Sequence, residues 1–182
     1  MNAWKTLSKK SILPYSKFLH VEEHVIELPD GRIIKDWPWV VTPDYINVAV
    51  VTTEKKFLCM RQFKYSAQAT ILAPVGGYLE PGEEPLEAAK RETLEETGYA
   101  APDWHFFGSY PVDGNRGCGT AHLFLAQQAY KVAEPDADDL EEQQLLQLSH
   151  ADVEKAVVNG EFKIMAWQMV MVMALWHLGR GQ

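Results

Sequence analysis

Three glutamates, Glu92, Glu95 and Glu96, are spaced so that a single helix would carry all of their carboxylates on one face. Like charges at this spacing repel each other, and the helix dipole disfavours anions near a C-terminus. The cluster therefore does not stabilise the fold. Mg²⁺ prefers oxygen ligands and binds carboxylates together with substrate phosphates and water. The cluster therefore suits a cation that meets a phosphorylated substrate. For an isolated triplet of glutamates, a solvated acidic face would be the better interpretation.

The residues around the cluster extend this pattern in both directions. A glycine comes first, a glutamate follows after five residues, and an Arg-Glu pair follows after seven more. The pattern G-x5-E-x7-R-E-U-x-E-E-x-G-U is filled by Gly77, Glu83, Arg91, Glu92, Thr93, Glu95, Glu96, Gly98 and Tyr99. Thr93 stands where an aliphatic residue is usual. On this motif the chain resembles the Nudix hydrolase superfamily.

The resemblance implies a fold and a set of roles. The fold is α/β (α+β): a mixed β-sheet sandwiched by helices, with a loop–helix–loop motif and an N-terminal antiparallel β-hairpin. It implies Mg²⁺ as the cofactor, with Mn²⁺ able to substitute, and catalytic roles for Arg91 and Glu92. Arg91 would pair with a carboxylate of the motif, most simply Glu83. The implied metal ligands are the carbonyl of Gly76 and the carboxylates of Glu92, Glu95, Glu96 and Glu141.

Residues before the motif resemble one branch of the superfamily, the ADP-ribose and nucleoside-diphosphate-sugar pyrophosphatases. Arg61-Gln62-Phe63 matches a segment of that branch, and residues 73–83 match the run that leads into the motif. Ala73 replaces a usual glutamate and Gly76 a usual alanine. The implied reaction is hydrolysis of the pyrophosphate bond of a nucleoside diphosphate sugar, with ADP-ribose the leading candidate. A nucleoside triphosphate or dinucleoside polyphosphate, or a module that binds nucleotide without cleaving it, remains an alternative.

Further residues are candidates for catalysis and substrate binding. In the resembling branch the general base comes from an acidic segment after the motif, here 136–142, where Glu141 is the first choice and Glu142 and Asp139 are alternatives. A flat aromatic ring can stack on a nucleobase, and the planar guanidinium of arginine suits phosphate. The candidate substrate-binding residues are Trp37, Trp39, Arg61, Asp113 and Arg116. The alternatives are packing in a core or interface for the tryptophans, a salt bridge for Arg61, and a plain flexible loop for residues 113–119.

The elements that carry these residues follow from hydrophobic periodicity and from glycine and proline positions. Two strands at about 17–28 and 32–41 should form a hairpin around Pro29-Asp30-Gly31. Further strands are expected at 46–53, 55–62, 67–72, 104–110, 121–129 and 145–148, with loops at 76–83 and 113–119. Helices are expected at 85–97, 150–158 and along the apolar stretch 164–178, which should be a buried helix.

The whole chain indicates a single small enzyme with an N-terminal addition. We expect a β extension at 1–43, used for dimerisation or substrate binding, and a hydrolase domain at 44–182; the resembling branch forms homodimers through such an extension. The 182 residues carry a net charge of −8, which argues against nucleic-acid and membrane partners. Two cysteines without a CxxC spacing and no signal peptide indicate the cytoplasm.

Overall fold

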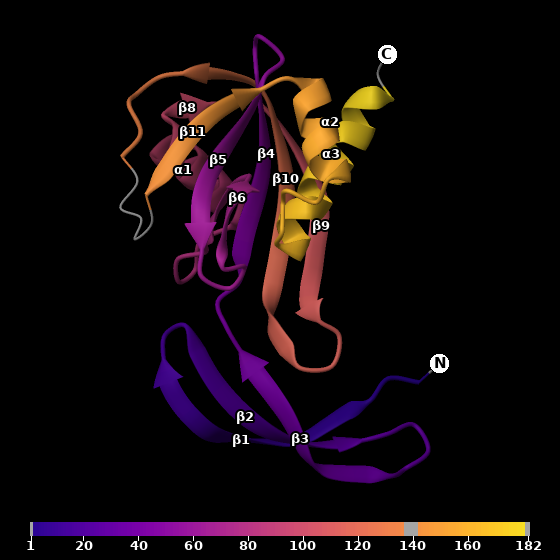
Figure 1. Ribbon diagram of the computed structural model, residues 1–182. Coiled ribbons are helices and arrows are strands. Elements are labelled where there is room, and N and C mark those ends of the chain that lie inside the picture. The colour runs from indigo at the N-terminus through magenta and orange to yellow at the C-terminus, as the bar shows by residue number, and fades with distance from the viewer. Residues whose placement is uncertain (1, 137–141, 181–182) are drawn as a thin grey trace. The chain divides into compact units, whose positions relative to one another are not determined.

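The computed structural model describes residues 2–136 and 142–180, which divide into two compact units (Figure 1). The N-terminal unit comprises Met1–Asp44 together with Tyr110–Thr120. The larger unit comprises Tyr45–Ser109 and Ala121–Gln182. The elements, in chain order, are β1 (Lys5–Ser16), β2 (Leu19–Glu27), β3 (Ile33–Val41), β4 (Tyr45–Thr52), β5 (Phe57–Lys64), β6 (Ala69–Ala73), β7 (Val75–Tyr78), α1 (Pro85–Thr97), β8 (Tyr99–Ala100), β9 (Asp103–Asp113), β10 (Gly117–Lys131), β11 (Gln143–Leu148), α2 (His150–Val158) and α3 (Met165–Gly179).

The N-terminal unit is an antiparallel sheet in which β2 pairs with both β1 and β3. The predicted hairpin is present as β2 and β3, and Gly31 closes its turn with a φ of 83° while donating its N–H to the carbonyl of Leu28. Strand β1 was not predicted. Every residue of β1 is exposed, so its sequence lacks the alternation of buried and exposed positions by which a strand is recognised.

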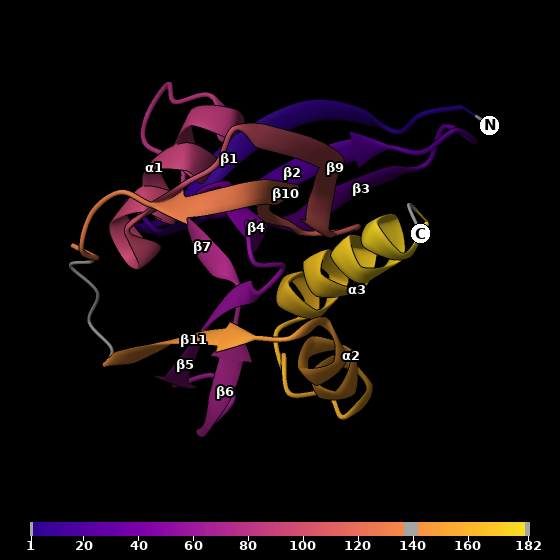
Figure 2. The ribbon, with the colours of Figure 1, turned by 90° about the horizontal axis from the view of Figure 1, so that it is seen from above.

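The larger unit is built on a mixed sheet, as the sequence predicts. Strand β10 runs parallel to β4, and β5 runs antiparallel to β4 and also pairs with β11. Strands β6 and β7 extend the sheet beside β5 and β4. Helix α1 lies on one face of this sheet, and α2 and α3 lie on the other, as the two ribbon views show (Figures 1 and 2).

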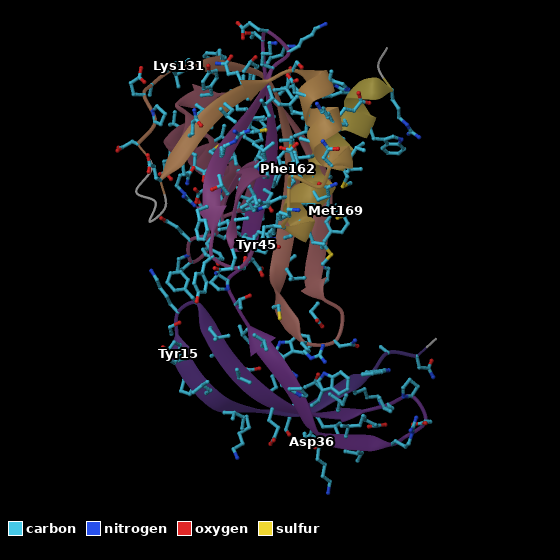
Figure 3. The ribbon with its side chains drawn as sticks, viewed as in Figure 1. Tyr15, Asp36, Tyr45, Lys131, Phe162 and Met169 are labelled. Atoms are coloured by element: carbon cyan, nitrogen blue, oxygen red, sulfur yellow. The ribbon has the colours of Figure 1, made fainter. Side chains whose placement is uncertain are left out.

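Strand β4 is the centre of the core because both of its faces are covered. On one face, Ile46, Val48 and Val50 pack in a buried cluster with Ala88 and Ala89 of α1. The small alanines let the helix axis approach the sheet closely. The other face meets α3, which buries Val170, Met171 and Ala174, and Phe162, just before α3, is also buried (Figure 3). The β-branched run that predicts β4 reflects this burial on both sides.

Helix α3 differs from the expectation of a buried helix. Met165, Met169, Val172 and Trp176 lie along one side of it and are exposed, Met165 by 81 % and Trp176 by 60 %. The prediction was wrong because the helix is apolar all round, so its sequence does not show which side the sheet covers. None of the helices in the described residues has the length and apolar character needed to cross a membrane.

Strand β7 is the second difference. The glycines at 76 and 77 predict a loop, but Val75–Tyr78 pairs with Tyr45–Val48 of β4 in register. The predicted loop at 113–119 is likewise shorter, because β9 continues to Asp113 and β10 begins at Gly117. Local propensity disfavours glycine in a strand, and here the neighbouring strand overrides it. Residues 76 and 77 are therefore fixed by a ladder rather than carried on a loop.

Candidate active site

Helix α1 runs from Pro85 to Thr97, as the sequence predicts, and carries the Arg91-to-Glu96 part of the motif. Proline suits the first helical position because its φ is already helical. Gly98 ends the helix in the left-handed conformation, with a φ of 74°, and its N–H donates to the carbonyl of Leu94. The buried side of α1 is formed by Ala88, Ala89, Thr93 and Thr97. Glu92 and Glu96 lie toward this same side of the helix, where they meet Gly77 and Gly76 of β7.

Arg91 is the hub of this region. Its Nε and one terminal nitrogen donate to the two carboxylate oxygens of Glu83, both at 2.9 Å. The other terminal nitrogen donates to Glu92 at 2.7 Å and to Glu95 at 3.1 Å. A further hydrogen bond of 3.1 Å reaches the Tyr78 carbonyl. The ion pair with Glu83 that the resemblance implies is therefore present, and it ties the loop after β7 to the helix.

These contacts change the acidity of the groups involved. The hydrogen bonds from Arg91 hold the pKa of the Glu83 carboxyl below its usual value, with burial opposing the shift. Glu83 in turn raises the pKa of the Arg91 guanidinium, which therefore stays charged. Only 15 % of the Glu83 side chain and 26 % of the Arg91 side chain are exposed, so water screens this pair less than a surface ion pair.

The two glycines of β7 bring the strand into contact with α1. A Cβ on Gly77 would lie 2.0 Å from the carboxylate carbon of Glu92, so only glycine leaves room for that side chain. The N–H of Gly76 donates to Glu96 at 3.2 Å. Within an antiparallel strand, the N–H and C=O of one residue point to the same side. The Gly76 carbonyl is therefore directed to the side on which Glu96 lies, away from β4.

The chemistry of these groups fits a hard divalent cation. All of the available donors are oxygens: carboxylates of Glu92, Glu95 and Glu96, and the Gly76 carbonyl. Across residues 2–136 and 142–180, no three His, Cys, Asp or Glu side chains are already grouped as a metal site. Arg91 accounts for part of this arrangement, because it draws Glu92 and Glu95 toward its guanidinium while Glu96 faces the Gly76 amide.

The acidic segment after the motif, residues 136–142, is described by the structure only at its two ends. Two of the candidate bases, Glu141 and Asp139, lie outside the described residues. Glu142 is described, is exposed, and immediately precedes β11. Asp136, at the start of the segment, donates its N–H to the carbonyl of Glu95, so the chain passes next to the end of α1 before it enters the acidic run.

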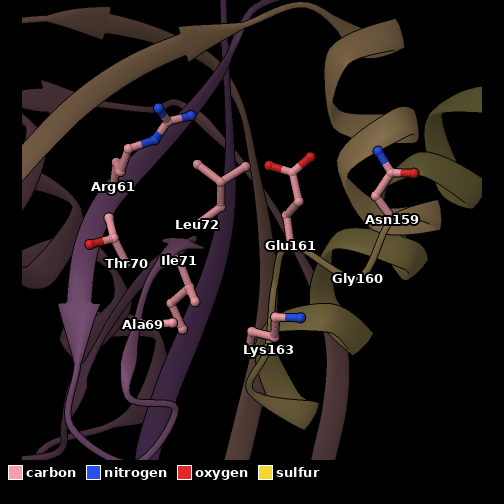
Figure 4. Close-up of a pocket in the computed structure, with 9 residues that line it drawn as sticks. All are labelled: Arg61, Ala69, Thr70, Ile71, Leu72, Asn159, Gly160, Glu161 and Lys163. Atoms are coloured by element: carbon pink, nitrogen blue, oxygen red, sulfur yellow. The ribbon is translucent and has the colours of Figure 1, made fainter.

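Arg61 lies on the other face of the sheet from the glutamates. On β5, Leu58 and Met60 pack toward α1, so the alternation of a strand directs Arg61 to the side of α2 and α3. There it lines a cavity of about 430 Å³ with residues of β6 and of the α2–α3 connection (Figure 4). The polar residues of this cavity are Arg61, Thr70, Asn159, Glu161 and Lys163. Ala73, in place of the usual glutamate, is fully buried in the core cluster.

The candidate residues Trp37, Trp39, Asp113 and Arg116 all lie in the N-terminal unit. Trp37 donates its Nε1–H to the Asn115 carbonyl at 2.8 Å, and Trp39 stacks on His24 with ring centroids 5.2 Å apart. Both tryptophans line a cavity of about 230 Å³ together with Trp4, Thr6, Lys9 and His24.

Asp113 and Arg116 belong to the turn between β9 and β10. The carboxylate of Asp113 accepts the N–H groups of Asn115 and Arg116, each at 2.7 Å, which holds the turn closed and lowers the pKa of Asp113. The Arg116 guanidinium lies 3.6 Å from the same carboxylate. The expected flexible loop is thus an ordered turn.

Two residues of these regions were missed by sequence reasoning. Asn47 is a polar residue in an otherwise apolar run and is 2 % exposed beside Gly76. His24 is 4 % exposed, and its Nε2–H donates a 2.8 Å hydrogen bond to a carboxylate oxygen of Glu22. The polar interruption of a β-branched strand is a signal that could have marked Asn47 as unusual. No comparable signal marked His24.

Comparisons with known proteins agree with the motif. The family model of the NUDIX domain matches residues 43–168. The chain is 31 % identical over 159 residues to the ADP-ribose pyrophosphatase of Bacillus subtilis (strain 168), covering 86 % of this chain and 84 % of that protein. It is 26 % identical over 153 residues to the methanol dehydrogenase activator of Bacillus methanolicus, covering 84 % and 80 %.

A solved structure shares the fold. It is described as an ADP compounds hydrolase, and it superposes with a TM-score of 0.81 at 18 % identity, covering 100 % of this chain and 97 % of that one. The chain belongs to the Nudix family. It is an enzyme, a Nudix hydrolase, and the members of this family generally use divalent metal ions.

The ion pair of Glu83 with Arg91 makes stability depend on pH in a defined direction. The carboxyl has a pKa near 4.5 in the unfolded chain and a lower pKa in the fold, so the contribution of the pair is complete above 4.5 and is lost as pH falls through the folded value. Glu83→Gln should therefore be less stable than wild type near neutral pH, and the difference should shrink as the pH is lowered below 4.5.

Urea unfolding followed by tryptophan fluorescence at a series of pH values measures this difference. Glu80→Gln, which removes an exposed carboxylate from the same loop, is the matched control and should show no such trend. A Glu83→Gln deficit that stays constant from neutral to acid pH would contradict the assignment.

Proposed function

We propose that this protein hydrolyses the pyrophosphate bond of nucleoside diphosphate sugars in a Mg²⁺-dependent reaction, with ADP-ribose as the leading substrate. Mn²⁺ is expected to substitute for Mg²⁺. The observation that carries the proposal is the arrangement around Arg91, which fastens the loop after β7 to α1 beside three glutamates. The Bacillus subtilis relative is named an ADP-ribose pyrophosphatase, and its alignment covers most of both chains. This name supports the choice of ADP-ribose.

The proposed cation ligands are Glu92, Glu95, Glu96, Glu141 and the Gly76 carbonyl. When bound, a divalent ion supplies neutralisation of phosphate charge and a lowered pKa of water. The protein itself must hold the carboxylates of the glutamates in fixed orientations. Arg91 does so by holding Glu92 and Glu95, and the Gly76 amide does so by holding Glu96. Alignment and charge stabilisation are the main requirements of phosphoryl transfer.

A carboxylate of the acidic segment is proposed to accept the proton of the attacking water. Glu141 is the first choice, with Glu142 and Asp139 as alternatives. The water oxygen forms a bond to one phosphorus as the bridging P–O bond breaks, and the leaving phosphate takes up a proton. For ADP-ribose the products are AMP and ribose 5-phosphate.

The substrate panel is the direct test. ADP-ribose, ADP-glucose, GDP-mannose, UDP-glucose, a nucleoside triphosphate and a dinucleoside polyphosphate are each incubated with protein and Mg²⁺, and the products are separated by chromatography. We expect ADP-ribose to give the highest kcat/KM. Preferred cleavage of the triphosphate or the dinucleotide would overturn the substrate assignment. Tight ADP-ribose binding with no turnover of any compound would indicate a sensing module instead.

Variants of the carboxylates test the proposed catalytic groups. Glu96→Gln should lower kcat by roughly 10²–10³-fold, the usual loss when one group that stabilises charge is removed. Among the candidate bases, Glu141→Gln should lower kcat more than Glu142→Gln or Asp139→Asn. Glu154→Gln, which changes an exposed carboxylate on α2, is the control and should be neutral. A Glu96→Gln enzyme with most of its activity would refute the cation role.

Substrate recognition is proposed to involve Trp37, Trp39, Asp113 and Arg116. Arg61, predicted from the sequence to meet a phosphate, faces the opposite side of the sheet from the glutamates, so no direct contact with the phosphates at the glutamates is proposed for it. The aromatic cavity of the N-terminal unit offers a tryptophan for a nucleobase, and stacking of a base on an aromatic side chain contributes about 1–3 kcal/mol. Because Trp39 is already stacked on His24, Trp37 is the better candidate for this contact. In the panel assay, Trp37→Leu should raise the KM for ADP-ribose more than it lowers kcat.

The N-terminal β extension at 1–43 is proposed to form a homodimer. Strand β1 is the end strand of its sheet and exposes Leu7, Ile12, Leu13 and Tyr15, each by about half or more. An end strand with an apolar surface favours pairing with another chain.

Sedimentation velocity at micromolar concentration should therefore give twice the chain mass of 20.6 kDa. Leu13→Lys should shift the protein toward monomer, while Lys55→Glu on a turn of the larger unit should not. A monomeric wild type would refute the dimer.

A further inference from the structure

Asn47 is a buried amide that lies in the middle of strand β4. Its neighbours along the strand, Ile46 and Val48, belong to the apolar cluster with α1, and the alternation of the strand directs Asn47 to the opposite face. It is only 2 % exposed. In the ladder with β7 it stands directly opposite Gly76. Asn47 therefore lies next to Gly76, the residue whose N–H donates to Glu96, and its side chain is on the face of the sheet opposite α1.

The Asn47 carboxamide occupies the space that a side chain at 76 would need. A Cβ built on Gly76 would lie 2.3 Å from the Nδ2 of Asn47 and 3.2 Å from the Ile46 carbonyl. No real pair of atoms approaches so closely, so alanine at 76 requires the amide or the strand to move. The resembling branch usually has alanine at this position. In this chain the amide of a neighbouring strand fills the volume of that missing methyl.

The burial of Asn47 has a cost that packing alone does not explain. Its Oδ1 is buried and has no hydrogen-bond partner among the described residues. A buried acceptor without a partner destabilises a fold, and an apolar residue would avoid the penalty. The contact of the Asn47 amide with Gly76 indicates a role for Asn47 other than packing. Gly76 is the residue whose N–H donates to Glu96, and its carbonyl is directed to the same side.

We propose that Asn47 is a positioning residue for the cation site. Its carboxamide sets how closely β7 lies against β4 at Gly76, and thereby where the Gly76 amide and carbonyl stand relative to Glu96. Asn47 touches neither substrate nor cation; it acts through Gly76, and the pair of residues 47 and 76 functions as a unit. The inference rests on the proposed function to the extent that Gly76 is taken as a cation ligand.

A double-mutant cycle tests the coupling. Mn²⁺ affinity of the substrate-free protein is measured by titration calorimetry for wild type, Asn47→Ala, Gly76→Ala and the double variant. Mutation of the hydrogen-bonded partners of metal ligands typically changes metal affinity by about 10–100-fold, and we use the lower end of this range for a packing neighbour. We expect Asn47→Ala and Gly76→Ala each to weaken Mn²⁺ binding by about tenfold or more, and the double variant to recover most of the loss because the alanine methyl enters the vacated space.

Gly179→Ala is the matched control, since a Cβ at that glycine meets nothing within 4 Å. It should leave Mn²⁺ affinity unchanged. A Gly76→Ala protein that binds Mn²⁺ like wild type overturns the proposal. A double variant as weak as Gly76→Ala also overturns it, because each residue would then act alone.

Amide hydrogen exchange at residue 76, measured by NMR without metal, separates this inference from the proposed function. Loss of protection in Asn47→Ala and in Gly76→Ala, and its return in the double variant, would support positioning by Asn47, even if wild type bound no Mn²⁺ and the cation role failed. Equal protection in all four proteins would overturn the inference while leaving Mg²⁺-dependent hydrolysis intact. A general loss of stability would instead alter exchange throughout β4 and β7.

Discussion

The ion pair between Arg91 and Glu83 is the interaction on which the rest of the site depends. Arg91 uses its planar fork on one carboxylate of the loop, and its remaining donors reach two glutamates of α1 and one carbonyl of β7. Three segments are thereby fixed to one guanidinium. A lysine carries a single charged head and would lack this geometry. The cluster of like charges on α1 is tolerable because the arginine balances part of it.

The sheet supplies the second constraint. Two adjacent glycines of β7 lie in a ladder with β4, and each has a neighbour in the space where a side chain would stand: Glu92 at Gly77 and Asn47 at Gly76. Gly76 and Gly77 face opposite sides of the sheet. Strand β7 is therefore contacted by Glu92 of α1 on one face and by Asn47 of β4 on the other. Rigid strands hold functional groups more accurately than loops do. The glycine end of the motif is therefore held in place from both faces of the sheet.

The two units divide the expected functions between them. The larger unit contains every described group of the motif, and the N-terminal unit contains the aromatic cavity with Trp37 and Trp39. Arg61, although it belongs to the larger unit, faces the cavity beside α2 and α3 rather than the glutamates. Arg61 and the glutamates thus lie on opposite faces of the sheet, because successive side chains of β5 alternate and its neighbour Met60 packs toward α1.

The sequence by itself determined the family, the helix that carries the glutamates and the hairpin of β2 and β3, since these depend on spacing along a few residues. The partner of Arg91 followed from the family resemblance. Only the tertiary structure decided that 75–78 is a strand, that β1 exists, and which side of α3 is exposed, since each depends on what a distant segment covers. The placement of Asn47 against Gly76 also required the ladder. Local patterns fix what a segment can form, whereas burial by non-local neighbours fixes which of those forms persists.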